Sequence, residues 1–294
     1  MRLAVLSSPA SWYFRDLVRA AAATHELTCL PFSRLASRLG APPASGPRAR
    51  FASGPVDLSS FDGVLVRSMP PGSLEQVVFR MDVLEQLRLS GVPVINPPKA
   101  LEVAIDKYLT NARLEAAGFL TPRTLVCQSC DEALAAFHEL GQDVVVKPLF
   151  GSEGRGLTRL TDEALALRCF RMLEQLGAVL YVQEFLPHEG CDWRLLVIGG
   201  RVLGVRRINP HDWRTNVSRG ARAEPLEIDA SLGDLALRAA ATVGAPLAGV
   251  DVLPTRDGRR FLLEVNAVPG WRGLAAALRV DVARLVLEYM ESVA

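Results

Sequence analysis

Lysine is scarce in this sequence. Of the 33 basic residues only three are lysines, Lys99, Lys107 and Lys147, and all the others are arginines. Genomic base composition is the simplest cause of this bias. Arginine is a planar fork that cannot imitate the compact ammonium group of lysine, so a retained lysine is a candidate for a position that needs a point charge.

Long apolar runs, a secreted pattern of cysteines and an excess of charge are also missing. No run approaches the ~20 residues of a membrane-spanning helix, and the apolar residues 3–6 are too few for a signal-peptide core. The five cysteines are unevenly spaced, unlike a disulfide framework. The net charge of +1 argues against nucleic acid or a membrane surface as the main partner. We therefore expect a cytoplasmic protein, either monomeric or a homo-oligomer.

The composition is that of a globular protein with a large core, because 49% of the 294 residues are hydrophobic and 22% are charged. In the first hundred residues, apolar strands at 3–6, 62–67 and 92–95 alternate with helices at 14–24 and 74–87, which predicts a parallel sheet covered on both sides. Residues 40–57, rich in Pro, Gly and Ser, are expected to form an exposed loop. The segment at 96–98 indicates a domain boundary. One helix is expected over 100–117, and hairpins are expected from residue 180 onward.

The sequence Asp257-Gly258 predicts a hairpin with a two-residue type I′ turn. In that register Asp251 faces Glu264, and Asn266 points to the same side as Glu264. Two opposed carboxylates repel each other, so the arrangement indicates a cation between them. Oxygen ligands suit Mg²⁺. The alternative is a solvated pair on an exposed face, but the apolar neighbours favour a buried strand.

A second hairpin is predicted at Gly199-Gly200. There Asp192 falls opposite Arg207, and Arg194 shares their face, whereas Arg206 points to the other side. The simplest interpretation is a surface ion pair. The pair would gain interest if it faced a phosphate site.

Such a phosphate site is suggested after residues 144–146, a buried strand that ends at Lys147. The following Gly151, Gly154 and Gly156 form a loop whose backbone N–H groups could surround phosphate oxygens. The glycine order differs from that of the P-loop and of the Rossmann fingerprint. An ordinary flexible turn is the alternative.

Three weaker signals remain. The polar stretch at residues 211–222 contains Arg214, and its alternative interpretation is a mobile basic loop. Arg67 ends a strand of the first domain, where it could bind a substrate carboxylate bidentately. Cys127 and Cys130 lack the further ligands of a zinc site and are expected to be inert packing residues.

Together these motifs resemble the ATP-grasp superfamily, and within it the RimK-like amino-acid ligases, over nearly the whole chain. The resemblance implies nucleotide-binding residues at Lys107, Lys147, Gly151, Ser152, Gly154, Gly156, Gln183, Glu184, Phe185, Leu186, Asp192 and Arg207. In that family, the segment matching residues 183–186 binds adenine through its backbone. The resemblance implies metal ligands at Asp251, Glu264 and Asn266, and residues near the reacting groups at Arg194, Arg214 and Asn216.

The implied fold is α/β, an ATP-grasp fold in three parts. These are a Rossmann-like N-terminal β/α domain at 1–98, a small central α+β domain with the glycine loop at 99–182, and a C-terminal α+β domain with the metal hairpin at 183–294. The implied cofactors are ATP and Mg²⁺, with two ions expected and Mn²⁺ as a substitute.

The implied activity is ATP-dependent carboxylate–amine ligation. An amino acid, L-glutamate, would be added to the carboxylate of a small cofactor such as a pterin, or of a protein C-terminus, through an acyl phosphate and with release of ADP and phosphate. One alternative is another ATP-grasp ligase, which forms a dipeptide or acts through a carrier protein in lysine or arginine biosynthesis. The other is a non-catalytic nucleotide-binding regulatory protein, which would have little need of the metal ligands and Arg214.

Overall fold

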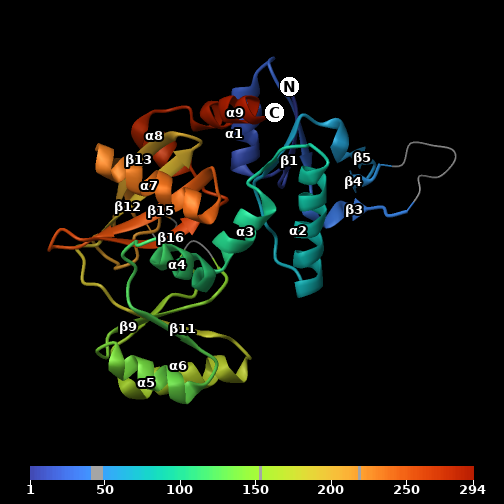
Figure 1. Ribbon diagram of the computed structural model, residues 1–294. Coiled ribbons are helices and arrows are strands. Elements are labelled where there is room, and N and C mark those ends of the chain that lie inside the picture. Colours follow the sequence, from blue (N-terminus) through green and yellow to red (C-terminus); the bar gives the residue numbers. More distant parts are fainter. Residues whose placement is uncertain (41–48, 152–153, 218–219) are drawn as a thin grey trace.

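The computed structural model describes residues 1–40, 49–151, 154–217 and 220–294. Ser152, which the family resemblance assigns to nucleotide binding, lies outside these ranges. Figure 1 shows two sheets side by side in the upper part of the molecule and a smaller lobe below them. No helix in the described ranges is long and apolar enough to cross a membrane.

The first sheet is parallel throughout, as the alternation of strands and helices predicts. Its order is β2-β1-β6-β7, with bounds β1 (Arg2–Leu6), β2 (Glu26–Leu30), β6 (Gly63–Val66) and β7 (Val94–Ile95). Alternate residues of the strands face opposite sides. One face packs on α2 (Leu74–Leu89), and the other packs on α1 (Trp12–Ala21) together with the C-terminal helix α9 (Val282–Val293). Both faces are therefore buried.

The expected loop at residues 40–57 is wrong for its second half. A small antiparallel sheet is present there, formed by β3 (Leu35–Ser37), β4 (Phe51–Ser53) and β5 (Val56–Asp57). Phe51 is only 1% exposed and anchors β4 in the core. Strands of two or three residues are too short for their alternation to be recognised. Short 3-10 turns, Phe32–Arg34 and Leu58–Ser60, flank this sheet.

The single helix expected over 100–117 is two helices. α3 (Pro98–Ile105) and α4 (Lys107–Ala116) are separated by Asp106, whose backbone is extended. The Asp106 carboxylate accepts a hydrogen bond from the Leu109 N–H at 3.0 Å and caps α4. This break makes Lys107 the first residue of α4, where its side chain can leave the helix towards the cavity.

The small lobe has its own core. Its antiparallel sheet has the order β10-β9-β11-β8, with bounds β8 (Thr124–Cys127), β9 (Val144–Lys147), β10 (Thr158–Leu160) and β11 (Leu180–Glu184). The helices α5 (Cys130–Glu139) and α6 (Glu163–Gln175) cover it. Cys127 and Cys130 are unpaired and buried in this core, which confirms that they are packing residues.

The large sheet carries both predicted hairpins. Its order is β14-β13-β12-β15-β16, with bounds β12 (Cys191–Ile198), β13 (Arg201–Ile208), β14 (Arg222–Pro225), β15 (Leu247–Pro254) and β16 (Arg260–Asn266). The remaining helices are α7 (Ala230–Val243) and α8 (Arg272–Leu278).

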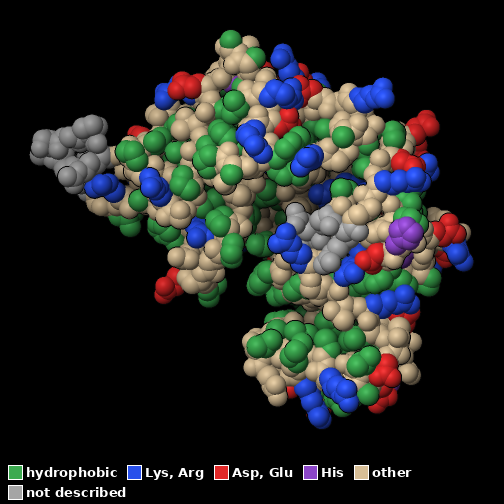
Figure 2. All heavy atoms as spheres, turned by 180° about the vertical axis from the view of Figure 1, so that it is seen from behind, with side chains coloured by type: hydrophobic (Ala, Val, Ile, Leu, Met, Phe, Trp, Pro, Cys, Tyr) green, Lys and Arg blue, Asp and Glu red, His purple; other side chains and the backbone are tan. Residues whose placement is uncertain are grey.

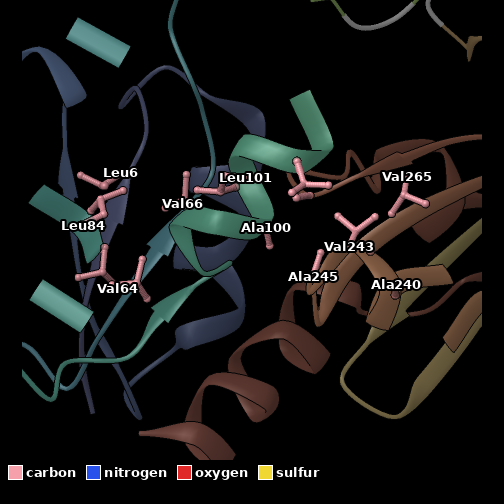
Figure 3. Close-up of a cluster of buried hydrophobic side chains, with 14 of the residues drawn as sticks. Leu6, Val64, Val66, Leu84, Ala100, Leu101, Ala240, Val243, Ala245 and Val265 are labelled. Carbon is pink, nitrogen blue, oxygen red and sulfur yellow. The ribbon is translucent and has the colours of Figure 1, made fainter. Parts of the chain in front are cut away.

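The two larger sheets share one hydrophobic cluster. In Figure 3 it runs from Val64 and Val66 of the first sheet, across Leu101 of α3, to Val243 of α7 and Val265 of the large sheet. A buried amide adds polar contacts to this junction. The side chain of Asn96 donates to the Leu247 carbonyl at 2.7 Å and accepts from the Leu247 N–H at 3.0 Å. The first and last parts of the chain are therefore packed as one body.

Candidate active site

The hairpin of β15 and β16 has the expected register at the carboxylates but a different turn. Asp251 pairs with Glu264, and Gly249 pairs with Asn266, as predicted. The turn is wrong, however: Thr255 N–H donates to the Arg259 carbonyl at 3.0 Å, so the loop has three residues, and only its Gly258 has positive φ.

A β-bulge restores the register. Near the turn the pairs are shifted by one residue, with Val252 opposite Leu262. The irregularity between Asp251 and Val252 leaves Leu263 as the extra residue on β16. Two deviations from the ideal hairpin therefore cancel, and the carboxylates still face each other.

Asp251 is neutralised by arginines of the chain itself. Its Oδ1 lies 2.6 Å from Arg194 Nη1, and its Oδ2 lies 2.9 Å from Arg207 Nη2. Burial alone would raise the pKa of Asp251, but these two guanidinium groups hold it below its usual value. The expected cation beside this carboxylate is thus provided in part by the protein.

The predicted pairing of Asp192 with Arg207 is confirmed, and the pair is buried rather than on the surface. Arg207 Nε donates to Asp192 Oδ1 at 2.7 Å, and the two side chains are 9% and 3% exposed. Arg206 points away, as expected, and pairs with Glu224 on the outer side. Asp192, Arg207, Asp251 and Arg194 therefore form one buried network of alternating charge.

Glu264, the carboxylate opposite Asp251, is not part of this ion-pair network. In the described ranges no lysine, arginine or histidine nitrogen lies within ion-pair distance of it. Its pKa is raised, first by burial and then by Asp251, while Lys107, Arg194 and Lys147 oppose the shift.

The donor set fits Mg²⁺, which is bound through one or two carboxylates plus substrate phosphates. The side-chain oxygen of Asn266 is already in use as an acceptor, because it accepts a hydrogen bond from the Val268 N–H at 2.8 Å. Among the described residues no three His, Cys, Asp or Glu side chains cluster as a metal site. Asp251 and Glu264 are thus the predicted oxygen ligands that line the cavity, and Asn266 stands two residues beyond Glu264 on β16.

Both candidate lysines reach the same cavity. Lys107 Nζ donates to the Gly151 carbonyl at 2.8 Å, so α4 is tied to the glycine loop. Lys147 ends β9, and burial, together with Lys107, lowers its pKa to about 8 against the opposing effect of Glu264. Gly154 and Gly156 have φ of +69° and +75°, conformations that only glycine adopts easily.

One cavity brings together most of the predicted residues, where the small lobe meets the large sheet. In Figure 2, Lys and Arg side chains border the hollow between the lobe and the main body. The predicted residues that line the cavity are Lys107, Lys147, Gly151, Gly154, Gln183, Glu184, Phe185, Leu186, Asp192, Arg207, Arg214, Asn216, Asp251 and Glu264. The predicted residues that do not line it are Gly156, Arg194, Asn266 and Arg67.

The segment at residues 183–186, in which β11 ends at Glu184, has most of its backbone donors in use. Glu184 N–H donates to the Arg123 carbonyl and Phe185 N–H to the Asp143 carbonyl, each at 2.9 Å. Leu186 N–H has no acceptor among the described residues, so of these three groups it is the donor left for a base. The Gln183 side chain is held by Thr124 at 2.8 Å.

The apolar side chains that line the cavity near residues 183–186 were not all predicted from the sequence. Trp213 lies edge-on to Phe185 with ring centroids 5.8 Å apart, and the Arg159 guanidinium lies 3.5 Å from the Phe185 ring centre. Leu253 and Leu263 also line the cavity. No local signal marks these residues, because long-range packing brings them together.

The segment with Arg214 and Asn216 is anchored on both sides. Asp212 pairs with Arg214 at 2.7 Å and fixes the guanidinium beside the cavity. Asn216 lies against the glycine loop so closely that a Cβ on Gly154 would overlap its side-chain oxygen. Residues 218–219, within the polar stretch at 211–222 whose alternative interpretation is a mobile basic loop, lie outside the described ranges.

Arg67 lies apart from the cavity. Its Nη2 donates to the Pro269 carbonyl at 2.8 Å, and its guanidinium lies 4.2 Å from the ring centre of Trp271. Any substrate group that Arg67 binds therefore lies outside this cavity.

The chain is similar to known ATP-grasp proteins over most of its length. A family model, the RimK-like ATP-grasp domain, matches residues 104–290. The tetrahydromethanopterin:alpha-L-glutamate ligase of Methanosarcina acetivorans is 31% identical, with 98% of this chain and 98% of its own length covered. The glutamate–LysW ligase ArgX of Sulfolobus acidocaldarius is 29% identical, covering 80% of this chain and 83% of its own. The ATP-grasp ligase PsnB, solved with a minimal precursor, is 25% identical, with a TM-score of 0.78 over 99% of both chains. It has also been solved with precursor, Mg and ADP, at a TM-score of 0.75.

Proposed function

Because the chain belongs to the RimK-like ATP-grasp family, we propose that it joins L-glutamate to an acceptor carboxylate with release of ADP and phosphate. Its α/β ATP-grasp fold and its class, an ATP-dependent ligase that forms carbon–nitrogen bonds, are those of its relatives. The acceptor is a small cofactor, in the manner of the relative that acts on tetrahydromethanopterin, or a protein C-terminus. We assign the three parts to residues 1–98, 99–182 and 183–294.

The observation that carries the proposal is one cavity in which an opposed carboxylate pair, with Asp251 buried, faces two lysines and a glycine loop. These are the groups that bind a nucleoside triphosphate with its metal. Lys107, Lys147 and the loop N–H groups bind the phosphates, and Leu186 N–H is a donor for the adenine. A binding module without chemistry would not need Arg214 and Asn216 fixed beside the glycine loop.

Mg²⁺ suits the oxygen donors of Glu264, Asn266 and Asp251. When bound, it neutralises charge on the transferred phosphoryl group. Two Mg²⁺ ions, replaceable by Mn²⁺, are part of the proposal. Arg194 acts here through Asp251, because its guanidinium pairs with that carboxylate and does not line the cavity.

The reaction has two steps. A carboxylate oxygen of the acceptor attacks the γ-phosphorus of ATP, ADP leaves, and an acyl phosphate forms. The amine of the amino acid then attacks the acyl carbon, loses a proton and expels inorganic phosphate. The residues of the chain contribute positioning and charge: Arg214, held by Asp212, stabilises the charge on the phosphoryl group, and Asn216 is a donor to it.

A carrier-protein ligase is the second candidate. It is favoured by the likeness to the ligase that acts on LysW. The two candidates differ in the acceptor and not in the cavity. A ligase of this second kind would form no product from small carboxylates and would need the carrier.

The test is to incubate the protein with Mg·ATP, L-glutamate and a cell extract and to search by mass spectrometry for acceptors heavier by one or more glutamate residues. An acceptor so identified is then labelled with ¹⁸O in its carboxylate. We expect ADP and inorganic phosphate carrying one label per amide formed. AMP as product, or unlabelled phosphate, would reject the acyl-phosphate route.

ATP affinity is expected to fall as the pH rises through about 8, the lowered pKa of Lys147. Above this pH the free protein must take up a proton to regain the ammonium charge, so affinity decreases by up to about tenfold per pH unit. Folding stability changes in the opposite sense, because between 8 and the usual 10.5 the unfolded chain binds more protons than the folded chain. Calorimetric titration with ATP on both sides of pH 8 measures the effect.

The matched variant for this test is Lys147→Arg, whose charge does not titrate in this range. It should bind ATP more weakly at neutral pH, since a planar fork replaces a point donor, and should show no decline near pH 8. A wild-type dissociation constant that is flat across pH 8 would contradict the role of Lys147.

Gly154→Ala is expected to weaken ATP binding by about tenfold to 100-fold, because the new methyl group overlaps Asn216 and displaces the loop. Gly177→Ala is the matched control. Gly177 has a similar φ of +67° but nothing within 4 Å of a new Cβ. Both variants should lose about 1 kcal/mol of stability from backbone strain. Equal ATP affinities in the two variants would show that the approach of Asn216 to the loop does not matter.

A further inference from the structure

Three side chains outside the cavity, Ser7, His25 and Arg67, have buried polar atoms without a partner among the described residues, and two of them, Ser7 and Arg67, follow neighbouring strands. In the described ranges, Ser7 Oγ and Arg67 Nε and Nη1 are fully buried and make no hydrogen bond. Ser7 is 3% exposed and Arg67 is 5% exposed. A buried guanidinium without a counter-ion is costly, so a protein that keeps one has a use for it.

These atoms lie where a parallel sheet binds ligands. Ser7 follows β1 and Arg67 follows β6, and these two strands are parallel neighbours. The chain leaves β1 for β2 on one side and returns to β6 on the other, so this is the point where the strand order reverses. Ligands of open α/β sheets bind outside the carboxyl ends of the strands at that point.

The adjacent helix end also favours an anion. α1 begins at Trp12, a few residues after Ser7, and its first turn has no acidic residue. The Ser11 side chain makes no capping hydrogen bond there. The positive end of the helix dipole is therefore not neutralised by an acidic side chain of the first turn or by a side-chain cap.

We propose that Arg67 and Ser7 form a subsite for a non-reacting carboxylate group of a substrate. This inference rests on the proposed function and deepens it, since it assigns recognition of one substrate to the first sheet. The donors available are Arg67 Nε and Nη1 and the Ser7 hydroxyl, because Arg67 Nη2 already donates to Pro269. Burial lowers the pKa of Arg67 only to about 10, so the guanidinium is charged at neutral pH.

The subsite is close to the metal-binding strand. Pro269, which accepts from Arg67, is three residues beyond Asn266, the last residue of β16. Three residues span at most about 11 Å. Glu264 is two residues further back on β16, so a carboxylate at Arg67 lies near the end of the strand that carries this cavity residue. Trp271 and Tyr13 flank the guanidinium with their rings, at 4.2 and 5.1 Å, and supply no acceptor.

The test compares thermal unfolding of wild type and Arg67→Met, without ligand and with L-glutamate or glutarate in the presence of Mg·ATP. In wild type we expect a carboxylate to raise the unfolding midpoint. In Arg67→Met the affinity should be about tenfold to 100-fold lower. The midpoint without ligand should be unchanged or higher, because an unpaired charge is removed. Arg80→Met is the matched control: Arg80 is also buried and donates to a proline carbonyl, at Pro70, but none of its nitrogens is a fully buried donor without a partner.

Ser7→Ala is a second test of the subsite, and its result does not depend on how Arg67→Met changes the packing around residue 67. It removes a hydroxyl that has no partner, so the midpoint without ligand should not fall, whereas carboxylate binding should weaken severalfold. Stabilisation by L-glutamate alone assigns the subsite to the amine-bearing substrate. Stabilisation by glutarate as well shows that a carboxylate without an amine is enough, as for the acceptor.

Three outcomes would overturn the subsite: no stabilisation of wild type by either carboxylate, equal stabilisation of Arg67→Met, or a lower midpoint of both Arg67→Met and Ser7→Ala without ligand. The proposed function is tested separately by ADP and amide formation. Ligase activity with an unchanged KM for both substrates in Arg67→Met rejects the subsite alone. Carboxylate binding that depends on Arg67, without ligase activity, rejects the proposed function alone.

Discussion

Glu264→Gln is expected to lower turnover by about 100-fold to 1000-fold while the protein stays folded or becomes more stable. The substitution removes the carboxylate charge that we assign to the metal, a charge that forms no ion pair with any residue in the described ranges. Because burial and Asp251 raise the pKa of Glu264, the ionised form destabilises the folded protein at neutral pH. The gain in stability should shrink as the pH falls through that raised pKa, since the wild-type carboxyl then carries a proton itself.

Asp251→Asn is the informative comparison. From the hairpin alone, the two substitutions are equivalent, because each removes one of two opposed charges. In the structure Asp251 is the shared partner of Arg194 and Arg207, so its loss should lower both turnover and stability. Thermal unfolding and turnover at saturating Mg·ATP distinguish the pair. Near-wild-type turnover of Glu264→Gln at limiting Mg²⁺ would remove Glu264 from the metal site.

Arg207→Met is expected to cost about 3–5 kcal/mol of folding stability, because it leaves Asp192 without its guanidinium partner and Asp251 with only Arg194. The control is Arg206→Met, one residue earlier on β13. Arg206 is half-exposed and pairs with Glu224 on the outer face, a contact worth at most about 1 kcal/mol. Urea denaturation of both variants gives the comparison.

A double variant distinguishes the loss of the ion-pair attraction from the cost of leaving the buried carboxylate of Asp192 without its arginine. Asp192→Leu added to Arg207→Met removes the carboxylate that Arg207 would have neutralised, so part of the stability should return. Equal losses in Arg207→Met and Arg206→Met would mean that the buried network contributes no more than a surface pair.

Turn chemistry decides how much of this site is predictable from the sequence. At Gly199-Gly200 the two-residue loop is real, and every pair from Asp192–Arg207 to Ile198–Arg201 follows from it. At Asp257-Gly258 the turn is a different one, and the right pairing of Asp251 with Glu264 depends on a bulge that no local pattern indicates. The prediction was correct there because two irregularities compensate.

Contacts between the hairpins could not be predicted in the same way. Arg194 meets Asp251 because β12 lies beside β15, a pairing of strands more than fifty residues apart. Turn residues fix the register within a hairpin and say nothing about which hairpins become neighbours. The break at Asp106 is a different case, since aspartate three residues before the Leu109 N–H is an ordinary N-cap signal that the apolar periodicity of the segment concealed.

The packing of α9 against the first sheet has a consequence for how the chain folds. The strands of that sheet are complete by residue 95, but one of their faces is covered by residues 282–293, so its closure is a contact of very long sequence separation. Contacts of this kind form late, because a large loop must be closed before they contribute. The small lobe, with a cluster drawn from residues 125–182, closes mostly short loops. During synthesis the middle of this protein is therefore expected to reach its native packing before its beginning does, which reverses the order in which the ribosome delivers them.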